Sequence, residues 1–222
     1  MKNTHGKVIL AGGGGAADSR PLDELLASWI GPQGRLLYVP IAMRGLYPFE
    51  ICLEWIEDTF LPLGMALDQI EMWENLAEHQ AGELDAFDAV YIGGGNTYSL
   101  LSEFRLSRFD TALTSYVRRG GMVYGGSAGA AILGADIQTI AHMDKNSVGL
   151  TSTRGLNLID GHAIWVHYLP HEDADIADYI RERNQPVIAV AERSGVVWDG
   201  VKLRAIGFEP AYEFTRQGKR QI

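Results

Sequence analysis

The chain has 222 residues, 46% of them hydrophobic and 21% charged, so it can bury a substantial core, and we expect one domain over residues 1–222. The formal net charge of −9 at pH 7 argues against nucleic-acid and anionic-membrane partners, because both favour a basic surface. Cys52 is the only cysteine, which excludes an internal disulfide and fits a reducing compartment. We interpret Cys52 as a packed thiol rather than a nucleophile.

The sequence indicates neither a signal peptide nor a membrane span. The apolar run at residues 8–11 is too short for a signal-peptide core. No stretch reaches the roughly 18 strongly apolar residues that a membrane helix needs. We therefore expect a cytoplasmic protein, and the sequence does not indicate its oligomeric state.

Through the first two-thirds of the chain, apolar β-prone runs alternate with segments of helical periodicity. This alternation indicates an α/β fold with a mostly parallel sheet and helices on both faces. We expect strands at Lys7–Ala11, Arg35–Pro40, Ala66–Met72, Ala86–Ile92 and Met122–Tyr124, and helices near Leu22–Trp29, Pro48–Phe60, Thr97–Glu103 and Asp110–Arg118.

The pattern changes in the last third, where short strands dominate. We expect strands at Ile137–Ile140, Ala163–His167, Pro186–Ala191, Gly195–Trp198, Val201–Ile206 and Tyr212–Phe214, with one helix at Asp173–Arg183. The dipeptide Asp199-Gly200 is a hairpin-turn signal. The sequence therefore predicts a hairpin extension at the C-terminal end of the sheet.

Ser127 stands between glycines, in Gly125–Ala130, after an apolar segment and before an Ala/Ile/Leu-rich one. This arrangement is typical of a nucleophile elbow, a sharp strand-to-helix turn that needs small flanking residues. The serine would lie at a helix N-terminus, where the amide of Ala128 can stabilise an oxyanion. The alternative is a glycine-rich turn whose serine only caps the helix.

A second glycine-rich loop, Gly93–Thr97, follows the fourth predicted strand. Loops at the carboxyl ends of parallel strands form the ligand-binding edge of such sheets. Glycines let the backbone approach closely, so Gly94 or Gly95 is the natural second oxyanion donor. The alternative is a tight turn in which Asn96 caps the next helix, and both descriptions are compatible.

The loop Gly12–Gly15 after the first strand satisfies a loose dinucleotide-binding pattern. A dinucleotide site expects an acidic residue about 20 positions further on, at the end of the second strand. That strand ends in residues 38–42, which contain no carboxylate. A dinucleotide-binding protein is therefore the alternative rather than the favoured interpretation, and we assign no cofactor.

A serine nucleophile needs a base and a group that orients the base. Six histidines are present, at positions 5, 79, 142, 162, 167 and 171. We favour His167 because it ends a predicted strand. Asp144 and Glu192 are both candidates for the orienting carboxylate, and the pattern does not choose between them. We assign no metal, because Pro170 prevents His167 and His171 from sharing a helix face.

The motifs Ile92–Thr97 and Tyr124–Ala130, with Gly155–Leu158 leading to His167-Tyr168, resemble the peptidase E and cyanophycinase group of serine hydrolases over nearly the whole chain. The fold of that group is similar to the class I glutamine amidotransferases. The resemblance implies Ser127 as nucleophile, His167 as base, and oxyanion donors from Gly94 or Gly95 together with Ala128. In that group, the third member of the catalytic triad has been assigned at two positions, which Asp144 and Glu192 occupy here.

The peptidase E branch cleaves dipeptides that begin with aspartate, and it carries an arginine shortly after the histidine. This chain has no arginine between His167 and Arg181, and that interval is acidic. The sequence therefore favours an amino-terminal or cationic substrate over an aspartyl one. Candidates that remain for binding a substrate carboxylate are Arg44, Arg105 and Arg154.

Together these observations predict a serine peptidase that hydrolyses short peptides, with no nucleic-acid or membrane partner. A non-catalytic module of the same fold that binds a small ligand is the alternative from a different functional class.

Overall fold

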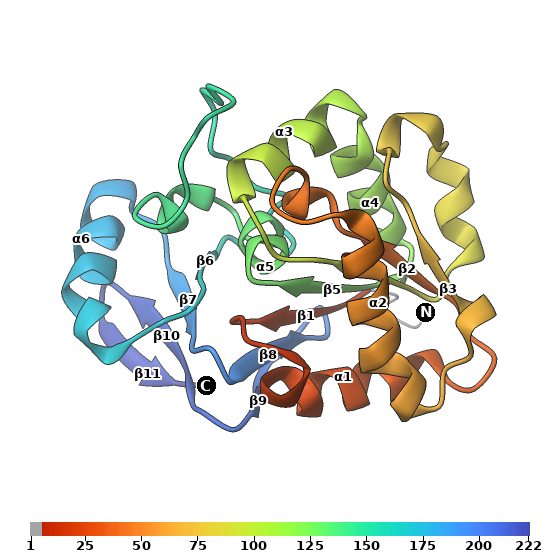
Figure 1. The fold of residues 1–222 in the computed structure, drawn as a ribbon. Helices are drawn as coiled ribbons and strands as arrows, with labels where there is room; N and C mark the ends of the chain where they lie inside the picture. The colour runs from red at the N-terminus through yellow and green to blue at the C-terminus, as the bar shows by residue number, and fades with distance from the viewer. Residues whose placement is uncertain (1–5) are drawn as a thin grey trace.

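The computed structural model describes residues 6–222, so His5 lies outside the described residues. Seven strands form the main sheet in the order β3-β2-β4-β5-β1-β8-β9. Strands β1 to β5 pair in parallel, and the hairpin β8–β9 adds antiparallel strands beside β1 (Figure 1). The bounds are β1 Lys7–Ala11, β2 Leu36–Val39, β3 Ile70–Met72, β4 Ala89–Ile92, β5 Met122–Gly126, β8 Ser194–Trp198 and β9 Leu203–Gly207.

Helices cover both faces of this sheet, as the sequence predicts. Alternate residues of β1 point to opposite sides, so Ile9 joins one apolar cluster and Val8 the other. The cluster around Ile9 is closed by α1 Ala16–Ile30 and α2 Phe49–Phe60. The cluster around Val8 is closed by α3 Thr97–Leu106, α4 Phe109–Arg118 and α5 Ala128–Leu133. None of the helices described for residues 6–222 has the length and apolar character that a membrane crossing needs.

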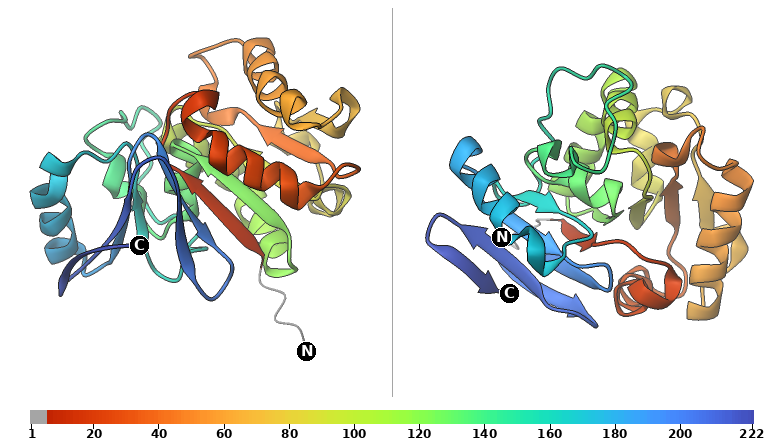
Figure 2. Two further views of the ribbon diagram at one scale, coloured as in Figure 1. Left: turned by 90° about the horizontal axis from the view of Figure 1, so that it is seen from below. Right: turned by 60° about the vertical axis from the view of Figure 1, so that its left-hand side comes forward.

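A second sheet, which the sequence does not predict, lies beside the main one in the order β11-β10-β7-β6. Its strands are β6 Ala163–Trp165, β7 Val187–Val190, β10 Ala211–Thr215 and β11 Gly218–Gln221, and α6 Asp173–Arg183 packs against it. Figures 1 and 2 show it at the opposite end of the molecule from α2. Strand β11 is also missing from the predicted elements, because its sequence is polar and all four residues are exposed.

The expected strand at Ile137–Ile140 is wrong, because this segment is a 3₁₀ helix. The carboxylate of Asp136 accepts a hydrogen bond from the amide of Gln138 at 3.0 Å, so it caps a helical turn. The predicted third and fourth strands are also shorter than expected, since 3₁₀ turns at Leu67–Gln69 and Ala81–Ala86 precede them. Further 3₁₀ turns occur at Ile41–Met43, Leu61–Leu63, Leu76–Glu78 and Pro170–Glu172.

Candidate active site

Ser127 occupies the sharp turn between β5 and α5. Its backbone has φ 48° and ψ −110°, a conformation that costs energy for a residue with a side chain. The flanking glycines make the turn sterically accessible: a Cβ on Gly125 would lie 2.5 Å from the carbonyl carbon of Gly129, and one on Gly129 would lie 2.3 Å from the Ile92 oxygen. The local geometry is therefore that of a nucleophile elbow.

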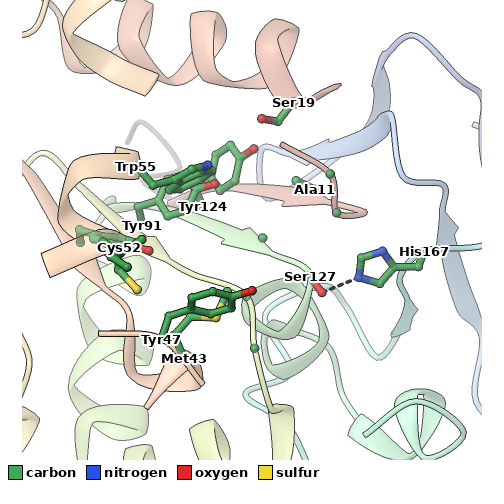
Figure 3. Close-up of a pocket in the computed structure, with 17 residues that line it drawn as sticks. Ala11, Ser19, Met43, Tyr47, Cys52, Trp55, Tyr91, Tyr124, Ser127 and His167 are labelled. Carbon is green, nitrogen blue, oxygen red and sulfur yellow. Dashed lines mark hydrogen bonds between the residues drawn. The ribbon is translucent and has the colours of Figure 1, made fainter. Parts of the chain in front are cut away.

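His167 reaches this serine from the segment that follows β6. The hydroxyl of Ser127 lies 2.6 Å from His167 Nε2 (Figure 3). His167 also has a left-handed backbone, φ 54°, and its amide donates to the carbonyl of Gly12 at 3.1 Å. A Cβ on Gly13 would lie 2.1 Å from the imidazole Cε1. The close approach of this histidine thus explains the glycine at position 13.

Of the two candidate acids, the structure brings Glu192 and not Asp144 to the histidine. Glu192 follows β7, and its Oε2 lies 2.5 Å from His167 Nδ1. Asp144 instead accepts a hydrogen bond from the amide of Thr97 at 2.7 Å. Its carboxylate therefore caps the N-terminus of α3.

The other predicted histidine candidates lie in different surroundings. His142 stacks on Trp165 with ring centroids 4.8 Å apart. His162 bonds to Glu213 at 2.9 Å. His167 is thus the histidine that contacts Ser127 in the described part of the chain.

The predicted oxyanion donors lie beside the serine. A Cβ on Gly94 would lie 3.4 Å from the Cβ of Ser127. The amides of Gly93 and Asn96, on either side, donate to the carbonyls of Val39 and Ala42. Within residues 6–222 the N–H groups of Gly94, Gly95 and Ala128 have no protein acceptor. An oxyanion site needs backbone N–H groups that have no protein acceptor, and these three meet that condition.

A cavity of about 370 Å³ opens beside Ser127. Its side chains are mostly aromatic or apolar: Tyr38, Met43, Tyr47, Ile51, Cys52, Trp55, Tyr91 and Tyr124. Within residues 6–222, no arginine or lysine lines it. The Arg44 side chain donates to the carbonyl of Glu74, and the Arg105 side chain donates to the carbonyls of Ser152 and Arg154. The acids at 172–178 do not line it either. Within the described residues, therefore, no carboxylate, lysine or arginine side chain lines the cavity.

Three of these aromatic residues form a ladder across neighbouring strands, which sequence reasoning missed. Tyr38 pairs with Tyr91, and Tyr91 pairs with Tyr124. Each is followed by one or two further strand residues and then by a loop of the ligand-binding edge. Their position one or two residues before the ends of three neighbouring strands is the signal that identifies them. Burial raises the pKa of all three phenols above the usual value of tyrosine, so they stay neutral.

Comparisons with known proteins agree with this geometry. The model of peptidase family S51 matches residues 8–206. An uncharacterized peptidase of Listeria innocua is 33% identical over 100 residues, which are 44% of this chain and 48% of that protein, so the match spans about half of the relative's length. Peptidase E of Shewanella amazonensis is 27% identical over 203 residues, or 87% of this chain and 80% of that protein.

Two solved structures share the fold. A candidate peptidase E of Listeria monocytogenes superimposes with a TM-score of 0.72 at 20% identity, over 92% of this chain and 100% of that one. A peptidase of an acI-B1 actinobacterium superimposes with a TM-score of 0.74 at 15% identity, over 99% and 95%. The predicted fold class and the predicted family are confirmed: this chain belongs to peptidase family S51.

Proposed function

We propose that this chain is a serine peptidase that hydrolyses short peptides. The observation that carries the proposal is the continuous set of hydrogen bonds from Ser127 through His167 to Glu192, at 2.6 and 2.5 Å. The names of the family and of the Shewanella relative support the same reaction class. A cytoplasmic location stays a prediction from composition.

In the proposed mechanism Ser127 attacks the carbonyl carbon of the scissile bond. Its proton passes to Nε2 of His167, while Glu192 accepts a hydrogen bond from Nδ1–H and so fixes the tautomer. The oxyanion binds to the N–H groups of Ala128 and of Gly94 or Gly95. His167 then donates its proton to the leaving amine, which departs and leaves an acyl-enzyme. Water, deprotonated by His167, attacks the ester carbonyl and releases the acid and the free serine.

The size of the cavity favours short substrates. About 370 Å³ lies in the range of small-molecule sites, 300–1,000 Å³ by general survey. Such a volume accommodates one large side chain with its adjoining backbone. A dipeptidase or another exopeptidase is therefore the form of the activity that we propose.

The test is hydrolysis of a dipeptide library by the wild-type protein and by Ser127→Ala. We expect the substitution to lower the rate by about 10⁴- to 10⁶-fold, because the nucleophile is lost. Circular dichroism should show the same fold. In parallel, a fluorophosphonate probe should label the wild-type serine and leave the variant unlabelled.

Two results would contradict the proposal. Undiminished hydrolysis by Ser127→Ala would exclude this nucleophile. A folded wild-type protein that neither reacts with the probe nor cleaves any dipeptide would indicate the small-ligand-binding module instead.

A further inference from the structure

The cavity beside Ser127 ends at a polar wall formed by α1 and β5. Ser19 and Tyr124 both line the cavity (Figure 3). Behind them lies Asp23, which is only 1% exposed and whose Oδ2 accepts a hydrogen bond from the Ser19 hydroxyl at 2.7 Å. Within the described residues, the second oxygen of Asp23 and the hydroxyl of Tyr124 have no hydrogen-bond partner. Buried polar atoms are rarely left without partners, so this wall is incomplete as it stands.

Asp23 is also without a counter-ion. It takes part in none of the ion pairs formed within residues 6–222. Burial raises the pKa of its carboxyl to about 6, against the opposing effect of the hydrogen bond from the Ser19 hydroxyl. The Asp23 carboxyl therefore lies buried behind the cavity wall with no cationic partner among the described residues, and a cation bound in the cavity would supply one.

The remaining walls are aromatic faces that suit a cation with an apolar stem. Tyr91 and Tyr124 are stacked, with centroids 4.2 Å apart and planes at 15°. Trp55 and Tyr38 meet Tyr91 at centroid distances of 5.8 Å each. Aromatic faces attract ammonium and guanidinium groups, and methylene chains pack well against such rings.

The cavity extends from Ser127 to the Tyr124 side chain. Tyr124 lies in β5 and Ser127 directly follows this strand, and both residues line the cavity. A side chain attached next to the attacked carbonyl must extend along the aromatic walls to meet the Tyr124 hydroxyl. The flexible four-carbon stem of lysine and the similar stem of arginine are the longest that proteins offer.

We propose that this cavity binds the side chain of a lysine or arginine on the N-terminal side of the scissile bond, with Asp23 as its countercharge. In the bound state the Tyr124 hydroxyl donates to Asp23 Oδ1 and accepts from the substrate cation. The inference rests on the proposed peptidase function, and it makes Asp23 a specificity-determining residue that acts through Tyr124 and Ser19.

The first experiment compares kcat/KM for lysine-, arginine-, norleucine-, phenylalanine- and aspartate-initiated dipeptides. Norleucine is the matched uncharged substrate for lysine. We expect the lysine-to-norleucine ratio to be about 10 in the wild type, and to fall about 10-fold, to near 1, in Asp23→Asn. Glu24→Gln is the control variant: it removes the same charge from the neighbouring position, which is exposed and paired with Arg20, and it should keep the ratio.

The second experiment measures binding without turnover. Isothermal titration of Ser127→Ala should give a Kd about 10-fold lower for the lysine dipeptide than for the norleucine dipeptide. Equal Kd values, or tighter binding of the phenylalanine or aspartate dipeptide, would overturn the inference. Because this readout needs no catalysis, it separates a wrong specificity from a failure of the peptidase proposal, which only the hydrolysis and labelling experiments report.

Discussion

At the scale of single residues, the site depends on which acid contacts the imidazole. Glu192 is 51% exposed in its side chain and lies 2.5 Å from His167 Nδ1. Asp144 bonds to the backbone of α3 instead. In the proposed mechanism, Glu192 fixes the tautomer of His167. Asp144 instead stabilises the N-terminus of α3.

Substitution of the two acids by their amides should separate these roles. Glu192→Gln is expected to lower kcat about 10³- to 10⁴-fold, because the amide no longer selects the correct tautomer. Asp144→Asn should lower kcat far less and should cost about 1 kcal/mol of unfolding free energy through the weakened cap. Steady-state kinetics and urea unfolding of both variants check this, and equal losses of kcat would refute the distinction.

At the scale of elements, the C-terminal hairpin β10–β11 supports the segment that carries His167. Nζ of Lys219 lies 2.6 Å from the Tyr168 hydroxyl and 4.1 Å from the centroid of the Tyr212 ring. It also bonds to the carboxylate of Asp173 at 3.0 Å. Since Tyr168 is the residue after His167, strand β11 holds the chain next to the imidazole. This strand lies beyond residues 8–206, the part matched by the family model.

Loss of the Lys219 contacts should therefore displace the side chain of His167. Lys219→Met is expected to lower kcat by about 10-fold with little change in KM, because a small displacement of a catalytic group is costly while the aromatic cavity is untouched. Lys219→Arg should restore part of the rate. Arg216→Met in the turn of the same hairpin is the control, since Arg216 forms no ion pair within residues 6–222; a similar loss of kcat in that variant would contradict a specific role for Lys219.

At the scale of the whole molecule, the main sheet divides two apolar clusters, and Asp23 is a carboxyl buried within the α1 layer. Burial raises its pKa from 3.8 to about 6 on folding. Between these values the folded chain binds the proton more tightly than the unfolded chain does. The free energy of unfolding is therefore higher at low pH, where the carboxyl is neutral, and it falls as the pH rises through about 6.

Asp23→Asn should remove this pH-dependent cost. We expect the variant to be more stable than the wild type at pH 8, by an amount on the order of 3 kcal/mol, and to show a much smaller gain at pH 4.5. Urea unfolding at the two pH values measures the difference. An equal change at both pH values would show that packing, and not ionisation, sets the effect.

Much of the first half of the fold could be predicted because its signals are local. Strand β1 has the predicted bounds, Lys7–Ala11, and α2 and α4 begin within one residue of their expected starts. Apolar alternation and helical periodicity are properties of short windows. The second sheet could not be predicted in the same way, because β10 pairs with β7 across the 20 residues that separate the two strands, and periodicity does not specify such pairings.

The sequence alone determined the turn at Ser127, because the steric demand of a positive φ and of close backbone contacts can be met only by small neighbours such as Gly125 and Gly129. Only the tertiary structure decided which acid meets His167, which tyrosines line the cavity, and that Asp23 lies behind them. Those contacts join residues far apart in the chain. Their distances follow from how the strands pair and how the helices pack, and no window of sequence contains that information.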